Sequence, residues 1–351
     1  MVNEVNETEI NLKDRVVKKN MLKERAKKAD DITDEMFDKC NKENKAMYKE
    51  YFSVMKSLSA ETAKQYRTCL KQFFYFVYTE LNDKPIYKIT KRDFMKYLAA
   101  MQERGLSSSA IGLRKSAVSS LCNYIENIVA DDDPDTYGTF HNFTRGMPTI
   151  AKDSVYQKEF VTQEEYEKMK TWLLQNNKIL PLAWLIGIYH IGCRRAELIQ
   201  FKTEILDYEI PEGANYVYSH VVRGKGPGVE GKPVRYMIPI EVLKYWKMWV
   251  DTRGYESEYI FTSNVKGEIK HISKNWGNRL CTQVLSPIIG RRITVHNFKA
   301  SIATRLLEQG VDMAIVSKEI CKHNDISVTQ KFYDLRTFEE QKEDIFKNVI
   351  I

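Results

Sequence analysis

One stretch near the C-terminus brings together a histidine and a tyrosine, side chains that can move protons or form covalent bonds. The stretch is CKHNDISVTQKFYD, residues 321–334, in which Tyr333 follows His323 by ten positions. A tyrosine on an apolar helical face is usually buried for its ring, and this chain has 20 tyrosines. Taken alone, the stretch favours a core tyrosine, and a reactive hydroxyl would need partners elsewhere in the chain.

Three further stretches supply basic side chains upstream of this tyrosine. The motif IGCRRAEL ends an apolar segment and supplies Arg194, the glycine-rich RGKGPG supplies Lys225, and VHNFKAS supplies His296 and Lys299. Each motif is weak by itself. Their appearance in one order, ahead of the histidine and the tyrosine, is a much stronger signal.

In order and spacing these motifs resemble those of the tyrosine recombinases, the phage-integrase and Xer family. The pattern of that family is an arginine in G-x-R-x-x-E-L, a lysine in a β-hairpin, H-x-x-R, a histidine or tryptophan, and a tyrosine shortly downstream. The positions that meet it are Arg194, Glu197, Lys225, His296, His323 and Tyr333. One position departs, because Lys299 stands where the second arginine is expected. The resemblance covers residues 50–345.

The resemblance implies that the protein breaks a DNA phosphodiester by direct attack. Such an attack builds negative charge on the two non-bridging oxygens. Without a metal, that charge must be met by fixed cations and hydrogen-bond donors. Arg194 would offer a planar fork to these oxygens, with Lys299 and His323 as further donors.

The remaining residues would carry the covalent step. Tyr333 would attack and become a 3′-phosphotyrosine, which divides one difficult exchange into two reversible ones. His296 would accept the phenolic proton, and Lys225 would protonate the departing 5′ oxygen. Because the ester energy is kept in the intermediate, we expect neither ATP, nor a metal, nor another cofactor. The sequence has no G-x-x-x-x-G-K-[ST] loop and no H-E-x-x-H motif.

Some of these assignments have structural alternatives. Arg195 lies beside Arg194, and either arginine alone is equally consistent with a surface charge or a helix C-terminal charge. Lys232 follows Lys225 by seven positions, and a lysine flanked by glycines is often only an exposed turn. We expect Glu197 to support the site by pairing with a cation.

Residues 46–130 show the periodicity of amphipathic helices. Apolar residues recur at three and four spacings in SAETAKQYRTCLKQFFYFVYTEL, which begins at Ser59. A second helix is indicated by TKRDFMKYLAAMQERG, where Thr90 and Asp93 resemble a capping box and Gly105 suits a helix end. A third follows in SSSAIGLRKSAVSSLCNYIENIV. A small helical bundle is predicted, similar to the SAM-like core-binding domain of the same family.

In that family, helices of the core-binding domain lie against the DNA duplex. The resemblance therefore implies phosphate contacts for basic residues of two of the predicted helices, namely Lys64, Arg67, Arg114 and Lys115. A solvated helix face is the alternative for each of them.

Residues 161–351 combine helical patterns with one short β region. The segment VTQEEYEKMKTWL opens with Thr162 and Glu165 as a capping box, and LPLAWLIGIYHIG is a mostly apolar helix. The segment ANYVYSHVVRGKGPGVEGKPVRYMIPI alternates around a glycine-rich turn, which predicts a short antiparallel hairpin or three-stranded sheet. We therefore predict a mostly α fold with a small antiparallel β-sheet, in which a helical domain precedes an α+β catalytic domain.

Breaks in these patterns predict the remaining boundaries. Residues 1–45 are rich in Lys, Asp, Glu and Asn and predict a charged, solvated extension. Residues 131–160 are interrupted by prolines and glycines and predict a linker. The resemblance implies that the two domains form a C-shaped clamp on DNA.

The tail, residues 334–351, carries apolar side chains at helical spacing: Leu335, Phe338, Ile345, Phe346 and Val349. In this family such a tail commonly docks on the neighbouring protomer. Packing on its own domain is the alternative.

The composition of the chain limits which partners and which cellular compartment can be expected. The net charge of +7 permits a polyanionic partner without demanding one. Six cysteines are scattered without a C-x-x-C pair, so neither a zinc site nor a redox pair is indicated. No apolar run approaches a membrane span, and the polar N-terminus lacks the apolar core of a signal peptide. We expect a cytoplasmic protein without a membrane partner.

Three functions remain open. The favoured one is a site-specific recombinase that exchanges strands of double-stranded DNA as a homotetramer, either as a mobile-element integrase and excisionase or as a Xer-like resolvase, with a directionality factor as a candidate accessory partner. The second is a type IB topoisomerase, which the separate core-binding domain and the G-x-R-x-x-E-L motif disfavour. The third is a DNA-binding relative that has lost catalysis, which Lys299 keeps open.

Overall fold

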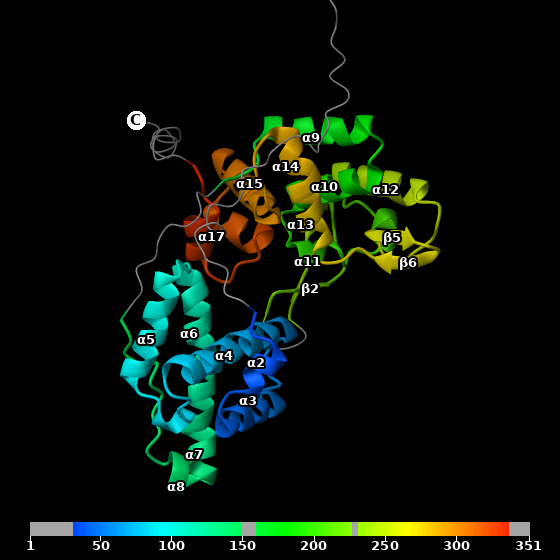
Figure 1. Ribbon diagram of the computed structural model, residues 1–351. Coiled ribbons are helices and arrows are strands. Elements are labelled where there is room, and N and C mark those ends of the chain that lie inside the picture. The colour runs from blue at the N-terminus through cyan, green and yellow to red at the C-terminus, as the bar shows by residue number, and fades with distance from the viewer. Residues whose placement is uncertain (1–30, 149–158, 227–230, 337–351) are drawn as a thin grey trace, which may run out of the picture. The chain divides into compact units, whose positions relative to one another are not determined.

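Residues 31–148, 159–226 and 231–336 are described by the structure, a computed structural model (Figure 1). These residues divide into two compact units, one made of residues 31–148 and the other of the residues from 159 onward. Helices dominate both units, and all the described strands are antiparallel and lie in the second. This arrangement confirms the predicted fold class. No helix in the described ranges is long and apolar enough to span a membrane.

The first unit is a bundle whose long helices alternate with short turns (Figure 1). Its elements are α2 (Asp34–Asp38), α3 (Lys42–Val54), α4 (Ala60–Glu80), η1 (Ile86–Lys88), α5 (Lys91–Glu103), α6 (Ser108–Tyr124), η2 (Ile125–Val129), α7 (Ala130–Asp132) and α8 (Pro134–Tyr137).

The predicted helix ends of this unit are confirmed by the capping contacts. The Ser59 hydroxyl accepts a hydrogen bond from the Thr62 backbone N–H at 3.2 Å and caps α4. Thr90 and Asp93 form the capping box of α5, and Gly105 follows that helix at φ +73°. Side-chain acceptors thus satisfy backbone donors that the first turn of a helix leaves free.

The helical unit includes parts of two neighbouring segments, the predicted solvated extension before it and the predicted linker after it. Helix α2 lies within the predicted extension, and its Phe37 side chain is buried. Tyr137, Phe140 and Phe143 lie in the predicted linker, yet all three are buried in the core of this unit. Proline and glycine break the helical periodicity here, but they do not prevent aromatic rings from packing.

The second unit contains the helices and strands that carry the predicted catalytic residues (Figure 1). Its elements are α9 (Gln163–Gln175), α10 (Ile179–Ile191), α11 (Arg195–Leu198), η3 (Thr203–Asp207), β1 (Tyr216–Tyr218), β2 (Val222–Gly224), β3 (Lys232–Val234), β4 (Met237–Pro239), α12 (Ile240–Thr252), β5 (Thr262–Val265), β6 (Glu268–His271), α13 (Trp276–Leu280), η4 (Cys281–Leu285), α14 (Ser286–Ile289), α15 (Val295–Glu308), α16 (Met313–Ile315), η5 (Val316–Ile320) and α17 (Ile326–Phe332).

Helix α10 is the centre of this unit. It is apolar around most of its circumference, and it packs against α9, α12 and α15. A helix that is hydrophobic on all sides is stable only when other elements surround it. The predicted capping box of Thr162 and Glu165 is confirmed at the start of α9.

The predicted β region forms two nested antiparallel pairs. β1 pairs with β4, with Tyr216 opposite Pro239, and β2 pairs with β3 inside them, with Gly224 opposite Lys232. A third pair, β5 with β6, lies further along the chain. The inner pair carries Lys225 directly after its first strand, so sheet pairing positions that residue.

Candidate active site

Arg194 lies at a sharp turn between two helices. α10 ends at Ile191, and Gly192 follows in the left-handed region at φ +69°. A Cβ atom on Gly192 would come within 2.6 Å of the Ile302 side chain, so this turn requires glycine. Arg194 thereby becomes the N-cap of α11.

Glu197 holds Arg194 at two points. Its Oε2 accepts a hydrogen bond from the Arg194 backbone N–H at 2.6 Å, and its Oε1 accepts one from Nη1 at 3.1 Å. Burial lowers the pKa of Arg194, but the Glu197 carboxylate outweighs burial and raises it overall. The guanidinium stays charged, and its fork has further N–H donors that can bind an anion.

Lys225 is exposed and makes no hydrogen bond or ion pair within the described ranges. The preceding residue, Gly224, lies against the carboxylate that holds Arg194, because a Cβ atom there would be 3.1 Å from Glu197 Oε1. Lys232, the alternative lysine, instead donates a hydrogen bond of 2.6 Å to the Asn324 side chain. Among the described residues, therefore, Lys232 has a partner for its ammonium and Lys225 has none.

His296 lies on the first turn of α15, with an exposed side chain. Desolvation by neighbouring atoms lowers its pKa, and nearby positive charges add to the effect, namely those of Arg195, Lys299, Arg194 and Lys225. Each of these four positive charges favours the neutral form of the imidazole. Its imidazole is mainly neutral at pH 7 and can accept a proton.

Lys299 lies one turn further along α15 and is buried, with 2% of its surface exposed. Its ammonium donates a hydrogen bond of 2.6 Å to the Cys321 carbonyl and lies 5.8 Å from the centre of the Tyr333 ring. Burial, reinforced by the charge of Arg194, lowers the pKa of Lys299 to about 8. Lys299 thus connects α15 to the segment that carries the histidine and the tyrosine.

His323 follows η5 in that segment. Its Nδ1 lies 2.8 Å from the Thr329 hydroxyl, and its ring centre lies 5.0 Å from that of Tyr333. Burial, with the positive charges of Lys299 and Arg194, lowers the pKa of His323 to about 4. The imidazole is therefore neutral at pH 7.

Tyr333 is the C-cap of α17, and its ring packs on a small apolar cluster of Ala303, Leu307, Val316 and Cys321. Its backbone N–H donates to the Thr329 carbonyl at 2.8 Å. Burial and Cys321 raise the pKa of the phenol, and Arg194 opposes them. Within the described ranges the hydroxyl has no hydrogen-bond partner. The ring is held in place while the oxygen is left free.

The structure thus groups all six predicted catalytic residues in the second unit, although they come from four separate stretches of the chain. The four predicted DNA contacts lie on α4 and α6 of the first unit. The side chains of Lys64 and Lys115 have no polar partner within the described ranges. Arg67 lies over the Phe52 ring at 4.7 Å, and Arg114 donates to Gln72 at 3.1 Å.

Two residues with contacts in the site were not predicted from the sequence. Thr329 is fully buried and lies between His323 and the Tyr333 backbone. Tyr236 donates a hydrogen bond of 2.6 Å to Glu197 Oε2. The spacing of Thr329 from Tyr333 is that of one helical turn, which is a usable signal. Nothing in the sequence near Tyr236 points to Glu197. Among the described residues, no group of three or more His, Cys, Asp or Glu is placed to hold a metal ion.

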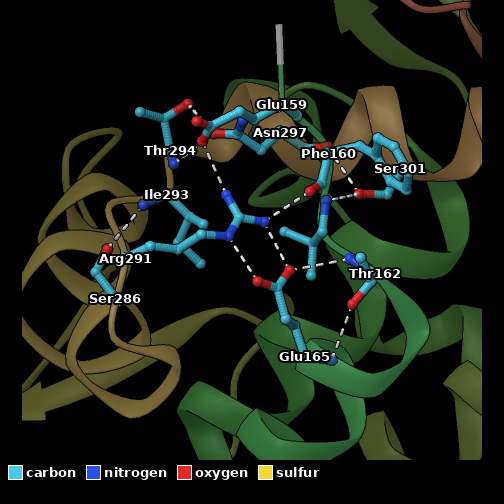
Figure 2. A network of polar contacts seen from close by, with 11 residues as sticks. Glu159, Phe160, Thr162, Glu165, Ser286, Arg291, Ile293, Thr294, Asn297 and Ser301 are labelled. Atoms are coloured by element: carbon cyan, nitrogen blue, oxygen red, sulfur yellow. Dashed lines mark hydrogen bonds and ion pairs between the residues drawn. The ribbon is translucent and has the colours of Figure 1, made fainter. Parts of the chain in front are cut away.

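Helix α15 carries His296 and Lys299. The segment just before its N-terminal end is anchored by Arg291 (Figure 2). The guanidinium donates two hydrogen bonds of 2.6 Å to Glu165, one of 2.9 Å to Glu159 and one of 2.7 Å to the Phe160 carbonyl. Asn297 adds a bond of 2.6 Å from its side chain to the Glu159 carbonyl. One charged network thus holds together α9, the start of α15 and the segment that contains Glu159 and Phe160.

We predict that Arg291→Met lowers the free energy of unfolding of this unit by about 1 to 3 kcal/mol, because charge-assisted hydrogen bonds are lost from a partly buried network. All five tryptophans lie after residue 171, so tryptophan fluorescence during urea unfolding reports on this unit alone. Lys168→Met is the matched control, since it removes an exposed pair with Glu164 on α9 and should change little. Equal unfolding midpoints for both variants would contradict the prediction.

Comparison with known proteins agrees with this geometry. Residues 159–339 match the phage integrase family, and residues 46–127 match the N-terminal SAM-like domain of phage integrases. The chain is 49% identical over 331 residues to the SPbeta prophage-derived recombinase-like protein YomM of Bacillus subtilis (strain 168), which covers 94% of this chain and 98% of YomM. It is 25% identical over 266 residues to the tyrosine recombinase XerA of Pyrococcus furiosus, covering 75% of this chain and 82% of XerA.

Solved structures show the same fold. One is the Tn1549 transposon integrase (residues 82–397) in complex with circular intermediate DNA, with a TM-score of 0.64, 18% identity and coverage of 87% of this chain and 99% of the integrase. Another is a lambda integrase dimer bound to a COC′ core site, with a TM-score of 0.57, 16% identity and coverage of 88% and 79%. Since the catalytic family match spans more than half of the sequence and a relative at 49% identity spans nearly all of it, the chain belongs to the phage integrase family of tyrosine recombinases.

Proposed function

We propose that this protein is a site-specific recombinase that cleaves and rejoins double-stranded DNA through a 3′-phosphotyrosine at Tyr333. The observation that carries this proposal is the Tyr333 hydroxyl, which has no hydrogen-bond partner among the described residues, on a ring held next to His323 and Lys299. A scissile phosphate bound next to the Tyr333 hydroxyl would contact fixed hydrogen-bond donors as negative charge develops on its oxygens.

The proposed step moves one proton at each end of the displacement. The Tyr333 oxygen bonds to phosphorus while the bond from phosphorus to the 5′ oxygen breaks. His296 takes the phenolic proton, consistent with its lowered pKa, and Lys225 gives a proton to the leaving oxygen. Rejoining reverses both transfers, so the chain's own residues are sufficient for the exchange.

Three donors would hold the non-bridging oxygens. Arg194 keeps its charge and has N–H groups beyond those bound to Glu197. His323 is neutral at pH 7, and when the Thr329 hydroxyl donates to Nδ1 the ring proton lies on Nε2 as a donor. Lys299 has three ammonium N–H donors. One of them is hydrogen-bonded to the Cys321 carbonyl, and the other two can bind the phosphate.

DNA binding by the first unit is proposed to use phosphate contacts from Lys64, Arg67, Arg114 and Lys115. Lys64 and Arg67 are exposed on α4, one turn apart, which suits contacts with one strand of a duplex backbone. Each contact should add to the salt dependence of binding. Solved relatives with this fold include integrases in complex with DNA.

The role in the cell is proposed from the relatives. One relative is named as derived from a prophage and another is a transposon integrase, which favours a mobile-element integrase over a resolvase of dimers. We propose that the protein acts in the cytoplasm as a homotetramer on two paired DNA sites. A directionality factor is a further candidate partner.

A suicide substrate, nicked close to the scissile phosphate, tests the proposed function. Covalent protein trapped on this DNA, followed by strand transfer into a second duplex, supports a recombinase. Covalent trapping with relaxation of supercoils but no transfer between duplexes would identify a type IB topoisomerase instead. Specific binding without any covalent product would identify a DNA-binding relative that has lost catalysis, the alternative kept open by the lysine at position 299, where the family pattern has arginine.

The tail supplies a prediction about assembly. Of its apolar residues, Leu335 lies in the described range, and its backbone N–H donates to Thr304 at 3.3 Å. Phe338, Ile345, Phe346 and Val349 lie outside the described residues. Truncation after Arg336 keeps the contacts of Leu335 and Arg336 with α15 and removes only the rest. We expect half-site binding to persist and cooperative occupancy of a full site to be lost.

Gel shifts on half and full sites measure this effect. The matched control replaces the charged residues of the removed segment while leaving its apolar residues, and it should bind with normal cooperativity. Unchanged cooperativity after truncation would show that the tail does not dock on a neighbouring protomer.

A further inference from the structure

Tyr236 is a buried tyrosine in the short connection between β3 and β4. Its side chain is 1% exposed, and its hydroxyl donates a hydrogen bond of 2.6 Å to Glu197 Oε2. Its backbone is fixed by Ser219, whose N–H donates to the Tyr236 carbonyl at 2.8 Å and whose hydroxyl accepts from the Tyr236 N–H at 3.0 Å. The phenol is thus anchored by the outer strand pair.

Glu197 depends on this phenol because its carboxylate is almost completely buried. Three donors reach it: the Arg194 backbone N–H and the Tyr236 hydroxyl at Oε2, and Arg194 Nη1 at Oε1. Without the hydroxyl, Oε2 would keep only the backbone bond. The carboxylate would then turn more freely and hold the Arg194 side chain less firmly.

The ring of Tyr236 also contacts the segment that carries His323. The Lys322 ammonium lies 5.7 Å from the ring centre, a cation–π distance, and the Lys322 side chain is 14% exposed. Lys322 has φ +53°, an unusual value for a residue with a side chain. The ring therefore supports a strained turn directly before His323.

Tyr236 cannot itself act as the nucleophile or as a proton acceptor. Burial raises the pKa of its phenol far above the ordinary value, with the neighbouring Cys193 and Glu197 adding to the effect. The phenol therefore keeps its proton at neutral pH and donates it in the hydrogen bond to Glu197. Its use in the site is therefore to position other groups.

We propose that Tyr236 is a positioning residue of the recombinase reaction, acting through Glu197 on Arg194 and through Lys322 on the turn before His323. This inference rests on the proposed function. It concerns the chemical step and not DNA affinity, because neither Tyr236 nor Glu197 is exposed to contact DNA.

Tyr236→Phe tests the hydroxyl while keeping the ring. In single-turnover cleavage of the suicide substrate by the intact protein, we expect a rate about tenfold slower, equivalent to about 1.4 kcal/mol. The dissociation constant for the half-site should stay unchanged. Tyr166→Phe is the matched control, since it also removes a buried hydroxyl, bonded to His190 at 3.0 Å and outside the predicted site. It should cleave at the wild-type rate.

A substrate with a methylphosphonate at the scissile position separates positioning from general loosening of the fold. Replacing one non-bridging oxygen by methyl removes the negative charge that Arg194 meets, so the penalty of Tyr236→Phe should shrink on this substrate. An equal penalty on both substrates would assign Tyr236 a merely structural role. Glu197→Gln should slow cleavage of the normal substrate at least as much as Tyr236→Phe.

The outcomes distinguish this inference from the proposed function. If the wild-type protein forms no covalent product, the proposed function fails, and the positioning role fails with it. If the wild-type protein forms the product and Tyr236→Phe cleaves at the same rate, only the role of Tyr236 is overturned.

Discussion

Tyr333→Phe is expected to abolish the covalent protein–DNA product while leaving specific DNA binding nearly intact. The substitution removes only the attacking oxygen. The ring contacts with the cluster around Leu307 and Val316 are kept, as is the backbone bond to Thr329. Electrophoresis of the suicide-substrate reaction in SDS measures the product, and gel shifts measure binding. We expect the product to fall below detection, because the other two hydroxyls described in the site, those of Thr329 and Tyr236, are buried.

Tyr255→Phe is the control for this experiment and should form the covalent product normally. Tyr255 lies outside the candidate site, next to Arg253 and Thr262. An SDS-resistant product from Tyr333→Phe would place the nucleophile elsewhere. Tyr255 would then be the next tyrosine to test, because Tyr236 is buried and bonded to Glu197.

The candidate site residues could be proposed from the sequence because their types and order follow short motifs, and the structure places all of them in one unit. Gly192, which the arginine motif contains, has the left-handed backbone and the close contact with Ile302 that exclude other residues. A motif of this kind can be read from the sequence because the backbone demands a particular residue type at a particular position.

The supporting contacts were not predictable, because they depend on packing between distant segments. Tyr236 and Glu197 are 39 positions apart, and they meet only when the outer strand pair folds next to α11. Arg291 and Glu165 are separated by 126 positions. Neither pair leaves a periodic or compositional mark in the sequence.

The predicted edges of the helical domain differ from the extent of its packing for a similar reason. Phe140 and Phe143 follow helix-breaking residues, so their segment has no periodicity, yet both rings are buried in the bundle. The local spacing of apolar residues indicates secondary structure. The boundaries of a domain instead depend on which apolar side chains are buried in the same core.

Lys299 is the position at which the chain departs from the family pattern. Because of its surroundings, we expect substitutions at this position to slow DNA cleavage strongly. The side chain is buried, and its ammonium is bonded to the Cys321 carbonyl, so little free space surrounds it. A guanidinium is larger and planar, so Lys299→Arg would overfill this space at a cost of about 1 to 3 kcal/mol. We expect Lys299→Arg to cleave the suicide substrate about tenfold or more slowly.

Lys299→Ala should be impaired more severely than the arginine variant. It loses both the positive charge and the bond that ties α15 to Cys321, and one charge-assisted hydrogen bond contributes about 1.5 to 3 kcal/mol. Single-turnover cleavage should therefore slow by about ten- to a hundredfold or more, with tryptophan fluorescence used to confirm folding. Wild-type cleavage by the alanine variant would show that Lys299 is not a phosphate ligand. Faster cleavage by Lys299→Arg would show that the wild type tolerates a slow step.

The pH dependence of cleavage gives Lys299 a signature that a change in folding would not reproduce. Burial lowers the pKa of this lysine to about 8, so its ammonium is charged below that pH and loses its charge as the pH rises. A bound phosphodiester favours the charged form, so the decline in wild-type cleavage should begin at or above pH 8. Arginine does not titrate in this range, and Lys299→Arg should lack the decline although its rate at pH 7 is lower. Cleavage rates from pH 6.5 to 9.5 compare the two proteins, and parallel declines would assign the titrating group to a residue other than Lys299.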